Sequence, residues 1–416
     1  MYGHRVVVTG LGAISPIGLT VDSYWQNLLA GVSGVGRITS FDPEGIPVQI
    51  AAEVKDFDPG NYMDRKASRR MERFAQFSIA AAGQALTDAR FDVTDANAWD
   101  VGAIIATGGG GIRAVADEME TLVTKGWERV GPMMVPLMIN NMASCQVSMH
   151  YGIKGPVVTN NAACAAGVYS LFEALHFLRR GDVEAVVTGG TESAVIPLAF
   201  ISMSRTGALS KRNDDPHTAS RPFDKDRDGF VFGEGAGIMV LETLEHAQAR
   251  GARILAELAG ASITGDAYHV SAPEPSGESA KRAILKAISD AELRPDDIDY
   301  VCAHGTGTPL NDSTETKALK LALGEHAYRI PVSSVKSMIG HLLGAAGALS
   351  AVAAIKALET GCVPPTINQF TADPDCDLDY VPWKPRKANI RNVIVNGFGF
   401  GGQNSVAVFK KWENGK

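Results

Sequence analysis

The chain has 416 residues, of which 45% are hydrophobic and 20% charged, as in a folded protein with one large or two ordinary domains. A net charge of −7 argues against nucleic acid as the main partner. Five cysteines without paired spacing, and no histidine-rich cluster, argue against both a disulfide framework and a metal site.

Short β-branched runs alternate with longer helical patterns along the chain. The expected strands cover residues 5–9, 101–107, 183–188, 237–241, 300–303, 331–333, 392–396 and 405–409. The expected helices cover 71–89, 165–180, 276–291, 312–323 and 344–359, and a long ordered loop covers 213–228. Strands that alternate with helices of this length predict an α/β layered fold.

The N-terminus has no basic segment followed by a long apolar run and a cleavage site, so we expect a cytoplasmic protein. An odd number of cysteines also suits a reducing compartment. The most apolar long stretch, residues 342–358, contains Gly344, Gly347, Ser350 and Lys356. This composition predicts a buried core helix and no membrane insertion.

Two patterns recur in the two parts of the chain. A strand, a glycine-rich turn and a helix are expected around 101–119 and again around 300–323. The run FVFGEGAGIMVL at 230–241 is likewise matched by FGFGGQNSVAVF at 398–409. We therefore expect two similar fused halves, residues 1–255 and 256–416.

Cys164 stands among small residues, between a β-branched run and an alanine-rich helical pattern. This pattern places the thiol at a strand-to-helix turn, near the free amides at the start of the helix. We expect those amides and the helix dipole to lower the pKa of the thiol and to stabilise an oxyanion on a bound thioester. A buried structural cysteine is the alternative interpretation.

Two histidines and a lysine in the second half could complement that thiol. His304 ends an expected strand in the run CAHGTGTP, and Lys336 and His341 share the run VKSMIGHLLGAAG. Imidazole and ammonium groups suit carbonyl polarisation and carbanion stabilisation. A capping or surface role is the alternative for His304. The glycine-rich run at 396–404 either fills space as a hairpin or brings backbone amides to a substrate, with Phe400 as a movable lid.

Together these runs resemble the thiolase-fold condensing enzymes, and specifically the elongating β-ketoacyl-acyl-carrier-protein synthases. The likeness covers nearly the whole chain, from VVVTGLG at 6–12 to FKK at 409–411. Its most specific parts are the turn of Cys164, HGTGTP at 304–309, KSMIGHLLGAAG at 336–347 and GFGFGG at 397–402. The resemblance implies a thiolase-like α/β fold in which two similar halves form a five-layer αβαβα sandwich.

The resemblance also implies a reaction and its residues. Cys164 would accept an acyl chain from an acyl carrier protein, and His304 and His341 would hold the malonyl carbonyl during decarboxylation. The amides of Cys164 and Phe400 would form the oxyanion hole, and Lys336 would complete the catalytic set. The implied substrate-binding residues are Thr306, Thr308, Gly109, Phe398 and Ser271. No cofactor is implied, because the phosphopantetheine arrives on the carrier protein, and a homodimer joined through edge strands is expected.

The sequence departs from the family at several positions. The family usually has Thr-Ala-Cys before the nucleophile, where this chain has Asn160-Asn161-Ala162-Ala163-Cys164. Ser350 stands where the family has a carboxylate that supports the lysine, so the partner of Lys336 is left open, with Glu315 as an alternative. Gln403 is a milder change.

Gly109 lies in the run GGGG at 108–111, which lacks the Gly-Lys-Ser/Thr of a phosphate loop. In the family this position borders the far end of the acyl pocket and is often bulky. A glycine there predicts space for longer or branched acyl chains.

A basic cluster begins a helix expected from residue 64. Spacings of three and four residues predict that Lys66, Arg69, Arg70 and Arg73 share one side. Because acyl carrier proteins are acidic, this face is a candidate docking surface, together with Arg205, Lys211 and Arg212. A solvated helix face is the alternative.

Three other functions stay open. The first is a ketosynthase of a polyketide or specialised-lipid pathway. The second is a non-condensing partner of a ketosynthase, against which Cys164 argues. The third is a thiolase that uses coenzyme A, which would not be expected to carry both the His304 and the His341 runs.

Overall fold

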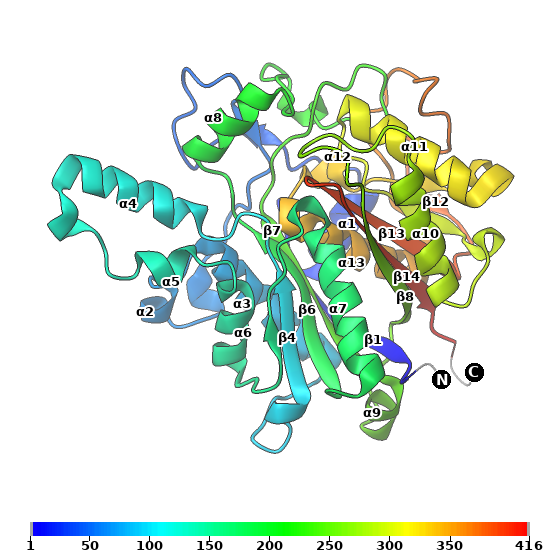
Figure 1. Cartoon of the computed structure of the whole chain (residues 1–416), viewed down its shortest axis with the longest axis horizontal. Helices are drawn as coiled ribbons and strands as arrows, with labels where there is room; N and C mark the ends of the chain where they lie inside the picture. Colours follow the sequence, from blue (N-terminus) through cyan, green and yellow to red (C-terminus); the bar gives the residue numbers. More distant parts are fainter. Residues whose placement is uncertain (1–2, 414–416) are drawn as a thin grey trace.

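Two five-stranded sheets meet along one edge in the computed structural model, which describes residues 3–413 (Figure 1). The first sheet consists of β1 (Val6–Ile14), β4 (Val101–Ala106), β5 (Val157–Val158), β6 (Ala185–Glu192) and β7 (Gly235–Thr243). The second sheet consists of β8 (Ala256–Gly265), β9 (Tyr300–Cys302), β10 (Val332–Ser333), β13 (Asn392–Gly399) and β14 (Gln403–Lys411). Numbered in chain order within each sheet, the strands lie in the order 3-2-4-5-1 in both.

Helices form three layers around the two sheets. α3 (Arg73–Ala89) and α6 (Met142–Tyr151) pack on the outer side of the first sheet, and α10 (Glu278–Asp290) and α11 (Pro309–Leu323) lie outside the second. Between the sheets lie α7 (Ala166–Arg180) and α13 (Ala346–Thr360) (Figure 1). The prediction of a thiolase-like sandwich with five layers is therefore confirmed.

The two sheets are continuous through a short pairing of β1 with β8, in which Val7 and Val8 lie opposite Glu257 and Ala256. The repeated strand order is what two similar halves would give. The division of the chain into units 1–255 and 256–416 stays a prediction.

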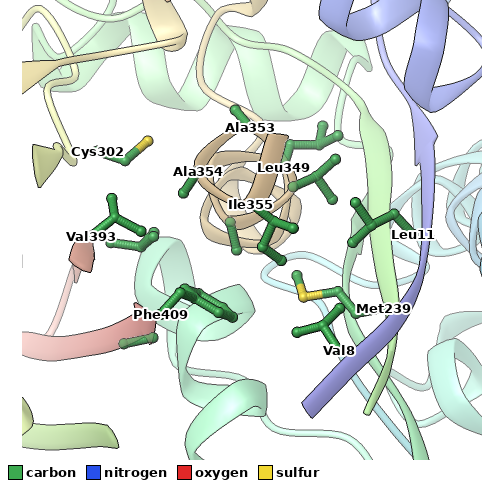
Figure 2. Packing of buried hydrophobic residues seen from close by; sticks show 14 of the residues in the cluster. Val8, Leu11, Met239, Cys302, Leu349, Ala353, Ala354, Ile355, Val393 and Phe409 are labelled. Carbon is green, nitrogen blue, oxygen red and sulfur yellow. The ribbon is translucent and has the colours of Figure 1, made fainter. Parts of the chain in front are cut away.

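α13 is buried at the centre of the molecule. Figure 2 shows Leu349 and Ile355 of this helix between side chains of both sheets, among them Met239 and Phe409. The window Leu343–Thr360 is apolar enough to cross a membrane by length and composition, but 78% of it is buried inside the protein. The prediction of a buried core helix is therefore confirmed.

The two central helices approach each other closely where each carries a glycine. A Cβ atom on Gly167 would lie 2.7 Å from the backbone nitrogen of Ala348, and one on Gly347 would lie 2.6 Å from Val168 Cγ2. Real Cβ contacts are longer, so only glycine permits this crossing. The crossing brings the starts of α7 and α13 together, and the site described below lies there.

All eight expected strands and all five expected helices overlap an observed element. The long strand β8 was missed, because its sequence AELAGASITG is rich in small and polar residues, and pairing with both β1 and β14 makes it a strand. The other helices are α1 (Val21–Leu29), α2 (Arg65–Ser68), α4 (Ile112–Lys125), α5 (Met134–Met138), α8 (Pro197–Thr206), α9 (Leu244–Ala249) and α12 (Lys336–Ile339). The other short strands are β2 (Gly36–Arg37), β3 (Ile50–Ala51), β11 (Cys362–Val363) and β12 (Arg386–Lys387).

Candidate active site

Cys164 lies in the middle of a 3-10 turn, Ala163–Ala165, that leads directly into α7. Ala163 adopts a φ of +49°, in the left-handed region that non-glycine residues seldom occupy. Such strained turns occur where a fold must present one side chain at a defined point. Cys164 is 7% exposed, and it lines a cavity.

That cavity has a volume of about 380 Å³ and joins the two halves of the molecule. Its lining contains Cys164 from the first half together with His304 and His341 from the second. The structure thus brings the predicted sulfur and both predicted imidazoles into one crevice. The predicted Thr306, Thr308, Phe398, Ser271 and Phe400 also line it.

The two histidines are almost fully buried, and their rings lie 5.3 Å apart at an angle of 85°. Burial holds the pKa of His304 and of His341 well below the ordinary histidine value, and the neighbouring Lys336 acts in the same direction. Both imidazoles are therefore neutral near pH 7, so each has one N–H to donate. Within residues 3–413 no group hydrogen-bonds His341 Nδ1.

Lys336 is 1% exposed and does not line the cavity itself. Its Nζ donates a hydrogen bond of 2.5 Å to the backbone oxygen of His304. Burial lowers the pKa of Lys336, and the carboxylate of Glu315 is the largest opposing influence.

Two carboxylates on the first turns of α11 hold the backbone of the His304 segment. Glu315 accepts hydrogen bonds from the backbone nitrogens of His304 (2.8 Å) and Gly305 (2.7 Å). Asp312 accepts from the backbone nitrogens of Thr306 (3.0 Å) and Gly307 (3.1 Å).

Asp312 was not predicted as a site residue from the sequence. Its sequence signal is its place three residues before Glu315 on α11, one helical turn away. Asp312 is 0% exposed and Glu315 is 1% exposed, so neither is a solvated helix-end carboxylate.

The prediction that the helix start lowers the pKa of Cys164 is wrong for the free protein. Burial raises the pKa of the thiol to about 12, although Lys336 and the backbone N–H groups of Phe400 and Cys164 itself act to lower it. Loss of hydration around the sulfur outweighs the favourable dipoles because the crevice excludes water. The backbone N–H groups of Phe400 and Cys164 favour the thiolate, but their effect is smaller than that of burial.

Of the five predicted substrate-binding residues, all but Gly109 line the cavity. Thr306 and Thr308 share a hydrogen bond of 2.9 Å between their hydroxyls. Phe398 lies 5.6 Å from His304, between ring centres, and Ser271 is exposed at the cavity mouth. Gly109 is not among the lining residues, and its backbone nitrogen donates to Glu192 instead (3.1 Å).

The predicted carrier-protein residues Lys66, Arg69, Arg70 and Arg205 are all exposed. Arg205 lies nearest the cavity, since the next residue, Thr206, is part of the lining. Of the further candidates, Lys211 is exposed and Arg212 is half-buried.

The single basic helix expected from residue 64 is wrong. α2 ends at Ser68 and α3 begins at Arg73. Arg73 turns inward, with its Nη2 2.9 Å from Glu234 Oε1 and its guanidinium 4.6 Å from the ring centre of Phe77. An ion pair and a cation–π contact inside the fold thus remove Arg73 from the basic surface.

Two family profiles match the chain. Residues 3–247 match the β-ketoacyl synthase N-terminal domain, and residues 255–370 match the β-ketoacyl synthase C-terminal domain. The chain belongs to the β-ketoacyl synthase family. A 3-oxoacyl-[acyl-carrier-protein] synthase 2 of Synechocystis is 50% identical over 409 residues, which are 98% of each chain. A protein of the same name from Staphylococcus aureus is 47% identical over 98% of this chain and 99% of its own.

Solved structures agree with the family. A ketosynthase bound to its acyl carrier protein in a type II polyketide system has a TM-score of 0.91 at 35% identity, covering 99% of this chain and 100% of that one. A β-ketoacyl synthase from Burkholderia phymatum has a TM-score of 0.92 at 33% identity over the same shares of the two chains. This chain is therefore an acyltransferase of the condensing type with a thiolase-like fold.

The departure of this synthase at Ser350 has a local consequence. Ser350 is 0% exposed, and its hydroxyl has no hydrogen-bond partner within the described residues. Glu315, the alternative carboxylate, raises the pKa of Lys336 but forms no ion pair with it among the described residues, and Lys336 Nζ donates to the backbone oxygen of His304 instead. Among residues 3–413 no cluster of three or more potential metal ligands occurs.

Proposed function

We propose that the protein is a 3-oxoacyl-acyl-carrier-protein synthase that elongates fatty acids by two carbons. The observation that carries this proposal is the single crevice in which Cys164 faces two neutral imidazoles. The higher identity to the two 3-oxoacyl synthases, 50% and 47%, than to the polyketide ketosynthase, 35%, favours fatty-acid elongation over the polyketide alternative.

In the first step, the thioester of an acyl carrier protein passes its acyl group to Cys164. The bond between acyl carbon and Cys164 sulfur forms, the bond to the carrier sulfur breaks, and the thiol proton of Cys164 leaves with the carrier thiol. The backbone N–H groups of Cys164 and Phe400, both of which lower the pKa of the thiol, would stabilise the tetrahedral oxyanion.

In the second step, malonyl-carrier protein loses carbon dioxide. The C–C bond to the carboxylate breaks, and its electron pair becomes an enolate whose oxygen accepts N–H bonds from His304 and His341. Neutral imidazoles suit this role, because they can donate without first protonating the carbanion. The enolate carbon attacks the acyl carbonyl, the bond between that carbon and the Cys164 sulfur breaks, and Cys164 leaves as a thiolate that takes a proton from water to regenerate the thiol.

The carrier protein would dock on the exposed basic residues Lys66, Arg69, Arg70 and Arg205. Its phosphopantetheine would enter past Thr306, Thr308 and Ser271, so the protein would need no cofactor of its own. A carrier protein occupies a ketosynthase in one of the similar structures. A reactive free thiol suits the reducing cytoplasm, where we place the protein.

A homodimer is the proposed assembly. β5 is the outermost strand of the first sheet, so one of its edges is unpaired within the described chain. The α4–α5 segment exposes large apolar side chains, among them Val123 (77%), Trp127 (76%) and Val135 (54%). An unpaired strand edge and exposed apolar side chains are typical of a surface covered by a second copy.

The central experiment follows the acyl group. The protein is incubated with acyl-carrier protein and digested, and mass spectrometry should locate the acyl group on Cys164. Addition of malonyl-carrier protein should release carbon dioxide and a 3-oxoacyl product. Cys164→Ala should abolish both, whereas Cys145→Ala, which removes a half-buried thiol outside the cavity, should leave both intact. Carrier binding without turnover would favour a non-condensing partner instead.

The docking surface and the dimer need separate tests. Charge reversal at Arg69 and Arg70 should weaken carrier affinity and flatten its salt dependence, unlike reversal of Arg282, which is exposed on α10. Val123→Asp should halve the mass in analytical ultracentrifugation. An unchanged affinity or mass would refute the respective assignment.

A further inference from the structure

The turn that carries Cys164 occurs twice in the molecule. The first copy is the three-residue 3-10 turn Ala163–Ala165 followed by the 15-residue helix α7. The second is the three-residue 3-10 turn Leu343–Ala345 followed by the 15-residue helix α13. Both turns start with a non-glycine residue in the left-handed region, at φ +49° for Ala163 and +43° for Leu343. Gly344 is therefore the counterpart of Cys164.

The second turn lacks the reacting groups of the first. Gly344 has no side chain where Cys164 has its thiol, yet its backbone N–H has the same position at the start of a helix. Such an N–H carries partial positive charge and attracts an anion. In the first turn, that place is left for the substrate oxyanion.

A glycine keeps the place above Cys164 open. Gly399 is the last residue of the eight-residue strand β13, and a Cβ atom on it would lie 3.1 Å from the backbone nitrogen of Cys164. Any larger residue at Gly399 would therefore crowd the N–H that is to meet the substrate. The equivalent strand of the first sheet is β6, which also has eight residues and ends at Glu192.

Glu192 fills the corresponding place in the second turn. Its carboxylate accepts hydrogen bonds from the backbone nitrogens of Gly344 (3.2 Å), Gly108 (2.8 Å) and Gly109 (3.1 Å). The Gly344 segment follows His341 by three residues, whereas Gly108 and Gly109 belong to the loop after β4. One carboxylate thus binds a segment of each half.

The surroundings of Glu192 contain no compensating cation. The residue is 0% exposed, and within residues 3–413 it forms no ion pair with lysine, arginine or histidine. Burial raises its pKa, and the backbone N–H groups of Gly344, Gly108, Gly109 and Ser193 are what oppose this. A buried carboxylate whose partners are N–H groups and one hydroxyl, that of Thr107 at 3.4 Å, is costly to maintain unless those contacts serve a purpose.

We propose that Glu192 is a positioning residue, an internal anion that occupies the empty counterpart of the oxyanion hole. It holds the segment that carries His341 against the loop at Gly108 and Gly109. A Cβ atom on Gly344 would lie 2.4 Å from the backbone nitrogen of Gly108, so these two segments already touch and have little freedom to move apart while Glu192 is present. The inference rests on the proposed function for its effect on the reaction, because His341 acts on the malonyl group there.

The test removes the Glu192 carboxylate by mutation and then supplies formate as a replacement carboxylate. Glu192→Ala should lower the kcat of condensation roughly 10- to 100-fold, as expected when a reacting group is misplaced by about 1 Å. Acyl transfer to Cys164, measured by mass spectrometry, should fall less, because His341 is not used in that half-reaction. Sodium formate should restore the kcat of Glu192→Ala by occupying the vacated N–H groups, and sodium chloride at equal ionic strength should not.

Two variants serve as controls. Glu192→Gln keeps the size of the side chain but turns an amide toward N–H donors, so it should be impaired without rescue by formate. Glu53→Ala removes another buried carboxylate that accepts backbone N–H groups, from Thr39 and Ser40 at 2.9 Å each, and formate should not restore its activity.

The outcomes separate the inference from the proposed function. If wild-type Cys164 takes no acyl group, the proposed function fails, and formate should still raise the thermal midpoint of Glu192→Ala above that in sodium chloride at equal ionic strength. Full activity of Glu192→Ala, or a loss that formate does not reverse, would overturn the inference. If Glu192→Ala does not fold, full activity of Glu192→Gln overturns it, and a fall in kcat at unchanged KM for acyl-carrier protein supports it.

Discussion

The turns at Cys164 and Gly344 share a backbone and differ in what they bind. Each is a strained three-residue turn before a central helix, and each directs an N–H into the middle of the molecule. Gly399 leaves the first N–H open to a substrate, whereas Glu192 closes the second. The comparison teaches that the fold supplies two anion-binding turns, and that side chains at two positions decide which one performs chemistry.

The largest expected effect comes from the histidine three residues before the second turn. His341→Ala should lower condensation by roughly 10²- to 10³-fold, the range for loss of one hydrogen-bond donor to an oxyanion. Asn161 is its counterpart three residues before Cys164, and Asn161→Ala should cost far less. Steady-state rates with malonyl-carrier protein measure both variants. Equal losses would remove the proposed difference between the turns.

The pH dependence of Cys164 provides the next test. Because burial raises the pKa of its thiol to about 12, the thiolate fraction at pH 8 is roughly one in 10⁴. Alkylation by iodoacetamide should therefore become about tenfold faster with each pH unit, with no plateau below pH 10. The charged groups that act on the sulfur are Lys336, which lowers its pKa, and Glu192, which raises it.

Variants of these two charged groups should shift the pKa of Cys164, and therefore its alkylation rate, in opposite directions. Glu192→Gln should lower the pKa of Cys164 and speed its alkylation at pH 8, because a negative charge near the sulfur is removed. Lys336→Ala should slow it for the opposite reason. A wild-type plateau near pH 8 would contradict the raised pKa.

Steric contact between the turns predicts a smaller effect on stability. Gly344→Ala places a Cβ atom 2.4 Å from the backbone nitrogen of Gly108 and should cost about 1–3 kcal/mol of unfolding free energy. Gly36→Ala is the matched control, since its nearest contact would be a flexible Lys55 Nζ at 3.9 Å. Urea unfolding measures both, and equal midpoints would refute the close contact.

The smallest effect is expected at a pair of serines on the two central helices. Ser170 on α7 donates a hydrogen bond of 2.6 Å to the backbone oxygen of Gly189, whereas the buried hydroxyl of Ser350 on α13 has no partner among the described residues. Ser170→Ala should therefore cost about 1 kcal/mol. Ser350→Ala should change stability by less than about 0.5 kcal/mol or raise it slightly. The same urea experiment would contradict this if the two costs were equal.

Local patterns were informative wherever a residue's neighbours in sequence set its structure. The helices α7 and α13 follow from apolar runs with small residues, and the turn at Cys164 follows from the change of pattern around it. β8 was not predicted because its pairing with β14, and not its composition, makes it a strand. The single basic helix was wrong because the helix is interrupted between Ser68 and Arg73, and Arg73 forms an ion pair with Glu234, which is far away in sequence.

Residue identities at short spacings are enough to identify the candidate nucleophile, both imidazoles and the family. The folded chain was needed to show that Lys336 donates to the backbone oxygen of His304, that burial raises the pKa of Cys164, and that Glu192 occupies the second turn. These features arise from dehydration and from contacts between segments far apart along the chain. The spacing of residues along the chain does not reveal dehydration or contacts between distant segments, because both depend on the folded arrangement.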